Sequence, residues 1–394
     1  MRDVFLGAPG VVCALGQGLQ ALRDGLFAPQ PSGLTTTDAF SAGRMLNLGL
    51  MPGELPAWFD PAPTRLRSRN NALLAAALAQ IRPQIDAALA RFGPARVAVV
   101  LGTSAAGLVE GEAAARWRLQ RDDWPPGYDY AQQEMGSASA FVAHELGVCG
   151  PAHVISTACS SGAKALASGA RLLRARLADA VVAGGVDALG GLTVAGFRAL
   201  ESVSAARCNP MSLNRCGINI GEGAALFMMT LDDGPVRLAG WGETSDAHHM
   251  SAPDPSGRGA IDAMRQALAR AAVEPETLDY LNLHGTATPQ NDAMESRAIA
   301  AVFSPGLPVS STKPLTGHAL AAAGAIEAAI AWLTLVDNPQ GRLPPHWWDG
   351  EHDPALPTLR LVEPGEALGR SLRHVLSNSF AFGGSNAALL FSGA

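Results

Sequence analysis

The sequence predicts an α/β protein made of two similar halves. Helical and strand patterns alternate along most of the 394 residues, which is typical of a mostly parallel sheet covered by helices on both faces. A chain of this length exceeds one ordinary hydrophobic core, so it should form two domains or one large duplicated unit. A similar order of elements occurs twice, and we therefore expect an N-terminal half at residues 1–234 and a C-terminal half at residues 235–394.

Each predicted half contains a helix, a strand that ends in a Gly-Thr turn, and a later Ser/Thr-rich turn that leads into another helix. In the first half the helix, the strand and the second helix are predicted at residues 70–92, 96–101 and 160–176. Their counterparts are predicted at residues 260–272, 280–283 and 319–336. Active sites of open α/β sheets lie at the carboxyl ends of strands. We therefore expect Cys159, His284 and His318, which each follow a predicted strand, to converge between the halves.

Composition narrows the class of protein. The net charge of −6 does not indicate non-specific nucleic-acid binding. The five cysteines are odd in number and widely spaced, which fits a reducing cytoplasm and not a disulfide framework. No pair forms a CxxC zinc motif, and the N-terminus carries no long apolar segment typical of a signal peptide. The apolar helix at 319–336 contains Glu327, so we expect a buried core helix and not a membrane span.

Cys159 is the strongest candidate for a reactive group. It follows a short β-rich run and precedes the helix predicted at residues 160–176. Exposed N–H groups and the positive end of the dipole at a helix N-terminus favour a thiolate, and the same N–H groups can hold an oxyanion. The alternative is a small buried core cysteine.

The two histidines and a nearby lysine fit acyl transfer through a thioester. A thiolate can attack an acyl thioester and keep the acyl group covalently. If a carboxylated second substrate then loses CO₂, two neutral imidazoles at His284 and His318 could donate hydrogen bonds to the enolate oxygen. Lys313, five residues before His318, would stabilise negative charge. The alternatives are structural histidines and a surface lysine.

The sequence resembles the β-ketoacyl-acyl carrier protein synthases of the thiolase superfamily, in the elongating Cys-His-His branch. Four blocks in the family's order carry the resemblance: Thr157-Ala158-Cys159-Ser160-Ser161, His284-Gly285-Thr286-Ala287-Thr288-Pro289, Ser311-Thr312-Lys313-Pro314-Leu315-Thr316-Gly317-His318, and Asn378-Ser379-Phe380-Ala381-Phe382-Gly383-Gly384. A narrower likeness, to the ketosynthases of bacterial aryl polyene clusters, rests on residues 68–71, 245–253 and Ala381. Ala381 stands where the family usually has glycine, and its added Cβ is expected to restrict the loop.

The resemblance implies a duplicated five-layer α-β-α-β-α architecture with two mixed sheets. It also implies a decarboxylative Claisen condensation of a cysteine-bound acyl chain with malonyl-acyl carrier protein, which gives 3-oxoacyl-acyl carrier protein. The implied pathway is aryl polyene synthesis or another type II polyketide or fatty acid pathway. No cofactor is implied, because the phosphopantetheine arm arrives on the carrier protein.

The same resemblance implies a role for each matching residue. Cys159 would be acylated, His284 and His318 would promote decarboxylation, and Lys313 would support this site with Glu327 as its acidic partner. Phe382 would gate access to the cysteine, and its backbone N–H would complete an oxyanion hole with that of Cys159. Thr286 and Thr288 would hydrogen-bond the phosphopantetheine arm.

Partners are implied as well. Arg65, Arg67 and Arg69 lie near the start of the helix predicted at 70–92, where cations oppose the helix dipole, and the family docks its acidic carrier protein near this helix. The alternative is a solvated surface cluster. The resemblance further implies a homodimer or a heterodimer with a chain-length-factor-like subunit.

Two rival functions remain at this stage. One is a non-catalytic chain-length-factor-like subunit, which the retained Cys159, His284, His318 and Lys313 oppose. The other is a hydrolase that uses a Cys-His pair, which would need access for water and no decarboxylation.

Overall fold

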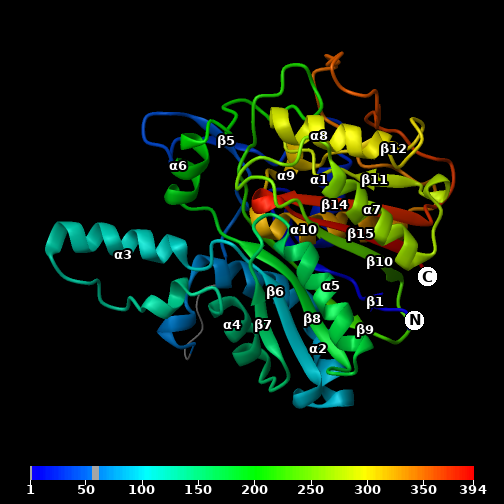
Figure 1. Ribbon diagram of the computed structural model, residues 1–394. Coiled ribbons are helices and arrows are strands. Elements are labelled where there is room, and N and C mark those ends of the chain that lie inside the picture. Colours follow the sequence, from blue (N-terminus) through cyan, green and yellow to red (C-terminus); the bar gives the residue numbers. More distant parts are fainter. Residues whose placement is uncertain (1, 56–61) are drawn as a thin grey trace.

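One large mixed sheet organises the chain in the computed structural model, which describes residues 2–55 and 62–394 (Figure 1). The sheet has 13 strands, 11 of which follow the order β13-β12-β11-β14-β15-β10-β1-β9-β8-β6-β7. The strands are β1 (Phe5–Leu6), β2 (Gly10–Cys13), β3 (Gly16–Gln17), β6 (Val97–Gly102), β7 (Ala152–Ile155), β8 (Ala180–Asp187), β9 (Gly223–Thr230), β10 (Val236–Ser245), β11 (Tyr280–Asn282), β12 (Pro308–Ser310), β13 (Arg360–Leu361), β14 (His374–Ala381) and β15 (Ser385–Gly393). A separate hairpin pairs β4 (Thr35–Thr37) with β5 (Leu46–Leu48).

Helices fill the segments between these strands. They are α1 (Gly18–Leu26), α2 (Arg69–Phe92), α3 (Leu108–Arg121), α4 (Ser137–Leu146), α5 (Ser161–Arg174), α6 (Gly191–Ala199), α7 (Arg258–Ala271), α8 (Pro289–Ala300), α9 (Lys313–Thr316) and α10 (Ala323–Leu335).

The two halves use the same strand arrangement. In the first, β7, β6 and β8 are parallel and β9 runs antiparallel to β8. In the second, β12, β11 and β14 are parallel and β15 runs antiparallel to β14. The short strand β1 pairs with both β9 and β10, so it joins the two expected sheets into one hydrogen-bonded path. In this detail the structure differs from the expected pair of separate sheets.

Three hydrophobic clusters place the helices in layers. Residues of α2 and α4 pack on one face of the first-half strands, and residues of α7 and α8 pack on the outer face of the second-half strands. Residues of α5 and α10 share a central cluster with strands of both halves. The order is therefore helix, sheet, helix, sheet, helix, and the predicted thiolase-like α/β fold class is confirmed (Figure 1).

Small residues let the central helices approach closely. A Cβ built on Gly162 of α5 would lie 2.6 Å from the carbonyl oxygen of Ala321, and one on Gly324 of α10 would lie 3.0 Å from the Cβ of Ala163. Both distances are shorter than ordinary van der Waals contact, so no larger side chain fits without movement. This approach brings the start of α5 beside the turn that precedes α10.

The helix predicted at 319–336 begins later than expected. A short 3-10 turn at Leu320–Ala322 comes first, and α10 starts at Ala323. The reason is the backbone of Leu320, whose φ of +48° an α-helix cannot contain. Residues 339–357 after α10 form neither a helix nor a strand, yet Leu343 and His346 within them are buried.

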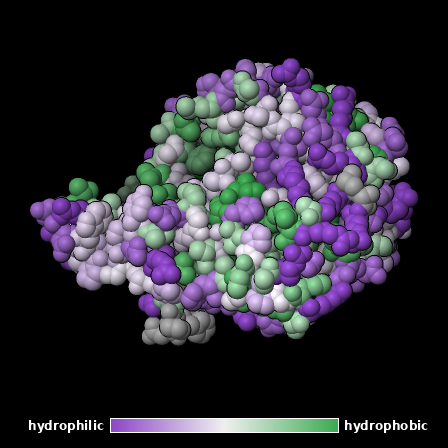
Figure 2. Space-filling view, turned by 60° about the horizontal axis from the view of Figure 1, so that its bottom comes forward, coloured by the Kyte–Doolittle hydropathy of each residue, from purple (hydrophilic) through white to green (hydrophobic). Residues whose placement is uncertain are grey.

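Helix α3 and the segment after it project from the body (Figures 1 and 2). Hydrophobic residues gather in the hollow between this projection and the body (Figure 2). Leu119, Trp124 and Tyr130 of the projection are exposed large hydrophobic side chains. Within residues 2–55 and 62–394, no helix has both the length and the apolar character needed to cross a membrane.

We predict that Gly162→Ala destabilises the protein by about 1–3 kcal/mol, because the added methyl group overpacks the contact with Ala321. Gly196→Ala in α6 is the matched control, since nothing lies within 4 Å of its built Cβ; we expect it to stabilise by about 0.4–1 kcal/mol. Denaturant unfolding measures both. Equal stability of the two variants would show that the crossing of α5 and α10 is not tightly packed.

Candidate active site

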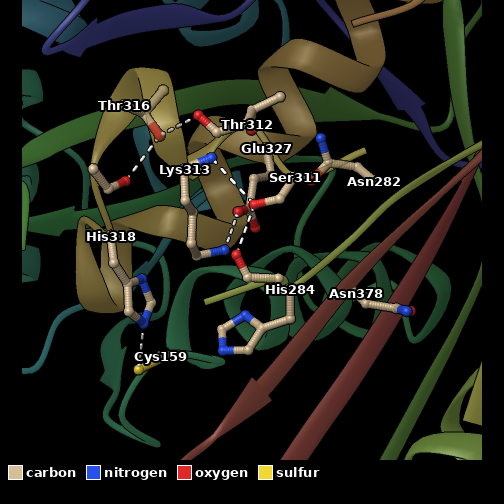
Figure 3. Close-up of polar contacts among 12 residues, drawn as sticks. Cys159, Asn282, His284, Ser311, Thr312, Lys313, Thr316, His318, Glu327 and Asn378 are labelled. Carbon is tan, nitrogen blue, oxygen red and sulfur yellow. Dashed lines mark hydrogen bonds and ion pairs between the residues drawn. The ribbon is translucent and has the colours of Figure 1, made fainter. Parts of the chain in front are cut away.

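Cys159, His284 and His318 line one cleft with about 630 Å³ of empty space. His318 Nε2 lies 3.1 Å from Cys159 Sγ. The ring centroids of His284 and His318 are 5.3 Å apart, with the ring planes at 82° (Figure 3). The structure thus brings together the three side chains that the sequence pattern placed at the ends of separate strands.

The turn that carries Cys159 has a strained backbone and is held by local side-chain hydrogen bonds. Ala158 has a φ of +51°, an uncommon conformation for a residue with a Cβ. The Ser161 hydroxyl accepts a hydrogen bond from Thr157 N at 2.8 Å, and the Ser160 hydroxyl donates to the Thr157 carbonyl at 2.9 Å. These bonds hold Cys159 two residues before the first residue of α5.

The helix N-terminus favours a thiolate at Cys159, whereas its burial favours the neutral thiol. The side chain is only 5% exposed, and burial raises the pKa of the thiol to about 12. Lys313 and the backbone N–H groups of Cys159 and Phe382 oppose this rise, but they do not overcome it. Loss of hydration therefore outweighs the helix N-terminus, and the sulfur needs a base when it reacts.

The two histidines are neutral. Both are almost fully buried, and burial lowers the pKa of each well below the ordinary value; Lys313 adds to the effect. Each Nδ1 atom is buried without a hydrogen-bond partner among the described residues. Neither ring is therefore held in one tautomer by the described protein, and Nε2 of His318 can either accept or donate a proton.

Lys313 is a buried residue and not a surface lysine. Its ammonium lies 2.6 Å from Glu327 Oε1, and the two side chains are 1% and 3% exposed (Figure 3). Burial raises the pKa of Glu327, and Lys313 opposes the rise. The pair places a positive charge beside the histidines, which is the charge that helps to keep them neutral.

Backbone contacts hold the two histidine turns. Glu295 of α8 accepts hydrogen bonds from the amides of His284 and Gly285 at 2.8 and 2.7 Å, and burial raises the pKa of this carboxyl to about 7. The amide of His318 donates to the carbonyl of Asn219 at 2.6 Å. The sequence analysis did not identify Glu295. Its only sequence signal is its position one turn after Asn291, in the helix that follows the motif at residues 284–288.

Asp187, which the sequence analysis also did not identify, links the two halves through hydrogen bonds. Its buried carboxylate accepts hydrogen bonds from the Thr103 hydroxyl and from the amides of Ser104 and Ala105, each at 2.8 Å. It also accepts a bond from the amide of Ala321, three residues after His318, at 2.8 Å. One carboxylate therefore ties the turn after β6 to the turn that leads into α10.

Phe382 lines the same cleft as Cys159. Its ring centroid is 5.7 Å from that of Phe197 on α6, and both rings line the cleft. The next residue, Gly383, has a φ of +79° and donates its amide hydrogen to the Met250 carbonyl at 2.7 Å. Ala381 has an ordinary extended backbone (φ −99°, ψ 157°), so in this conformation its Cβ introduces no strain.

Thr286 and Thr288 also line the cleft. Their hydroxyl groups lie 2.9 Å apart and form a hydrogen bond with each other. Both can also face a polar chain that enters the cleft, since a hydroxyl both donates and accepts.

The three predicted docking arginines differ in their surroundings. Arg65 is exposed, and Arg67 Nε donates to the Ala62 carbonyl at 2.8 Å. Arg69 forms an ion pair with the buried Glu222, with Nε 2.8 Å from Oε2. The amide of Arg69 also donates to Glu110. Glu110 and Glu222 thus explain why the positively charged Arg69 is tolerated at the start of α2.

In the described part of the chain, no group of three or more histidine, cysteine or acidic side chains could hold a metal ion.

Comparisons with known proteins match both halves of the chain. Residues 75–234 match the family model "Beta-ketoacyl synthase, N-terminal domain", and residues 236–346 match "Beta-ketoacyl synthase, C-terminal domain". A 3-oxoacyl-[acyl-carrier-protein] synthase 2 from Staphylococcus aureus is 35% identical over 271 residues, which cover 64% of this chain and 66% of that protein. The aligned part thus spans just under two thirds of that relative's length.

Solved structures are similar over the whole chain. A ketosynthase (ApeO) in complex with its chain length factor (ApeC) from Xenorhabdus doucetiae is 42% identical, with a TM-score of 0.94 over 100% of this chain and 98% of that one. The ishigamide ketosynthase/chain length factor is 26% identical, with a TM-score of 0.90 over 100% and 99% of the two chains. With these matches the resemblance inferred from the motifs is confirmed, and the chain belongs to the β-ketoacyl synthase family.

Proposed function

We propose that the protein catalyses a decarboxylative Claisen condensation between an acyl chain held on Cys159 and malonyl-acyl carrier protein. The product is 3-oxoacyl-acyl carrier protein. The observation that carries the proposal is the 3.1 Å contact between the Cys159 sulfur and a neutral His318, with a neutral His284 beside it in the same cleft.

In the first step the sulfur attacks the thioester carbonyl of the acyl donor. Nε2 of His318 takes the thiol proton as the S–C bond forms. The N–H groups of Cys159 and Phe382, which face the sulfur, are placed to hold the developing oxyanion. The intermediate then collapses, the carrier thiolate leaves, and it takes the proton back from His318.

In the second step the malonyl thioester enters the same cleft. His284 and His318, in the tautomer with hydrogen on Nε2, donate hydrogen bonds to its thioester carbonyl oxygen; the unpartnered Nδ1 atoms allow His318 to change to this tautomer after the first step. The bond to the carboxylate breaks, CO₂ leaves, and its electron pair forms an enolate that these two donors and the nearby Lys313 stabilise. The enolate carbon attacks the acyl carbonyl on Cys159, the C–S bond breaks, and the sulfur leaves as a thiolate. It takes up one proton from water, which balances the charge that the malonyl carboxylate carried.

The pathway proposed is aryl polyene synthesis, or another type II polyketide or fatty acid pathway. The likeness to the ApeO ketosynthase, at 42% identity along nearly the full length of both chains, supports the first of these. The cleft takes the thioester arm past Thr286 and Thr288, and the proposed chemistry uses no metal or organic cofactor of its own.

The proposed partners are an acyl carrier protein and a second ketosynthase-like subunit, either a copy of this chain or a chain-length-factor-like protein. The proposed docking residues for the carrier protein are Arg65, Arg67 and Arg69; Arg65 is exposed, and Arg69 also pairs with Glu222. The exposed hydrophobic residues on the α3 projection support a subunit contact. The five free cysteines support a cytoplasmic location.

A non-catalytic chain-length-factor-like subunit is the alternative. Two of the similar solved structures contain such a subunit beside a ketosynthase. The intact Cys-His-His set and its buried Lys313 favour the catalytic role, because a binding subunit has no need for a costly buried ion pair beside a nucleophile.

Mass spectrometry of the purified protein with acyl-carrier protein and malonyl-carrier protein tests the proposal. We expect an acyl adduct on Cys159 and malonyl-dependent formation of 3-oxoacyl-carrier protein, both lost in Cys159→Ala. An adduct followed by free acid would support a hydrolase. No adduct, with or without a chain-length-factor-like partner, would support a binding subunit.

We also predict that Lys313→Met alone destabilises the protein by about 3–5 kcal/mol, because it leaves Glu327 buried without a partner. Adding Glu327→Gln should restore most of this stability by removing the orphaned charge. Decarboxylation of malonyl-carrier protein should remain impaired in both variants. Thermal unfolding and CO₂ release measure the two effects, and full activity in the stable double variant would exclude a role for the Lys313 charge.

A further inference from the structure

His346 is a buried histidine that the proposed chemistry does not use. It lies in the Pro-rich segment after α10, its side chain is 2% exposed, and it does not line the cleft that holds Cys159. Its amide donates to the Val362 carbonyl at 2.8 Å, which fixes the segment against the strand region of β13.

Both ring nitrogens of His346 have backbone partners from distant parts of the chain. Nδ1 accepts a hydrogen bond from the Ser311 amide at 3.0 Å, and Nε2 lies 2.9 Å from the Pro210 carbonyl oxygen. An amide N–H only donates and a carbonyl oxygen only accepts, so the ring carries its hydrogen on Nε2. Burial lowers the pKa of His346 to about 4, which keeps this neutral form at physiological pH.

The hydrogen bonds of His346 form a bridge between Ser311 and Pro210. At one end of this bridge, Ser311 contacts both the turn that carries His284 and the turn that carries Lys313. The Ser311 hydroxyl donates to the carbonyl of Gly285, the residue after His284, at 2.7 Å. The same hydroxyl accepts from the Lys313 amide at 3.3 Å (Figure 3). Ser311 is therefore a junction between the His284 turn and the Lys313 turn, and His346 holds the backbone of that junction.

The other end of the bridge, at Pro210, also connects to the turn that carries His284. The next residue, Met211, has a φ of +63° and donates its amide hydrogen to Asp292 of α8 at 2.8 Å. The other oxygen of Asp292 accepts from the Ala287 amide at 3.2 Å. His346 thus closes a ring of contacts that runs from the Lys313 turn through residues 210–211 and Asp292 to the His284 turn.

We propose that His346 is a positioning residue that holds the Lys313 and His284 turns in register for decarboxylation. This inference rests on the proposed condensing function. Acylation of Cys159 depends on groups that contact the sulfur, namely His318 and the N–H groups of Cys159 and Phe382, and the bridge to Ser311 touches none of these. Loss of the bridge should therefore slow decarboxylation far more than acylation.

Three substitutions separate the two hydrogen bonds. His346→Phe keeps the ring size and removes both bonds. His346→Asn places an amide oxygen where Nδ1 stood and keeps an acceptor for Ser311. His346→Gln places an amide nitrogen near the position of Nε2 and keeps a donor for Pro210. His352→Phe is the control, since His352 is an exposed histidine of the same segment and is stacked edge-on against Trp348.

The experiment measures acyl transfer to Cys159 from acyl-carrier protein and CO₂ release from malonyl-carrier protein, with thermal unfolding of each variant. In His346→Phe we expect decarboxylation to fall on the order of 10- to 100-fold, while acylation stays within about threefold. The KM for malonyl-carrier protein should change little, because the docking surface is untouched. His346→Asn should retain more decarboxylation than His346→Gln, and His352→Phe should match the unsubstituted protein.

An unchanged ratio of decarboxylation to acylation in His346→Phe would overturn the inference. If that variant does not fold, equal ratios in His346→Asn and His346→Gln would overturn it instead. Absence of CO₂ release from the unsubstituted protein would contradict the proposed function itself, which distinguishes the two failures.

Discussion

Burial of the contact between Cys159 and His318 is the constraint on which the site depends. The sulfur comes from the turn before α5 in the first half, and the imidazole from the turn before α10 in the second. Neither half alone can bury both groups. Gly162 and Gly324 let the two helices approach, and the Asp187 carboxylate bonds the turn after β6 to Ala321. Burial then sets the protonation states: a thiol, two neutral imidazoles, and a paired lysine.

These protonation states suit two successive reactions in one cleft. A neutral imidazole can accept the thiol proton during acylation, and a neutral imidazole with hydrogen on Nε2 can donate to an enolate oxygen during decarboxylation. A protonated histidine could not serve in the first step. The positive charge of Lys313 opposes a second positive charge on the rings, and in the proposed reaction it also stabilises the enolate. The ion pair with Glu327 lowers the free-energy cost of burying that charge.

Much of the fold and the three central side chains could be predicted from sequence, because their signals are local. The repeated helix, strand and turn pattern indicated two halves, and the strand ends indicated where Cys159, His284 and His318 meet. Asp187 and His346 were missed because their partners are distant; His346 and Pro210 are 136 residues apart. The partners of Glu295 are only 10 and 11 residues away, but an acidic residue in a helix gives no sequence signal that its carboxyl group is buried. The expected thiolate at Cys159 differs from the thiol that burial favours for a related reason. The helix N-terminus is a local feature, whereas the burial that dominates the pKa arises only when both halves pack together.

A direct spectroscopic titration of the sulfur tests the central claim. Thiolates absorb in the far ultraviolet and thiols do not, so the difference between the unsubstituted protein and Cys159→Ser isolates this one group. The account predicts no thiolate band from Cys159 between about pH 6 and 9, because burial keeps the proton on the sulfur. A band present at neutral pH and lost only on acidification would show a resting thiolate–imidazolium pair and would contradict the account.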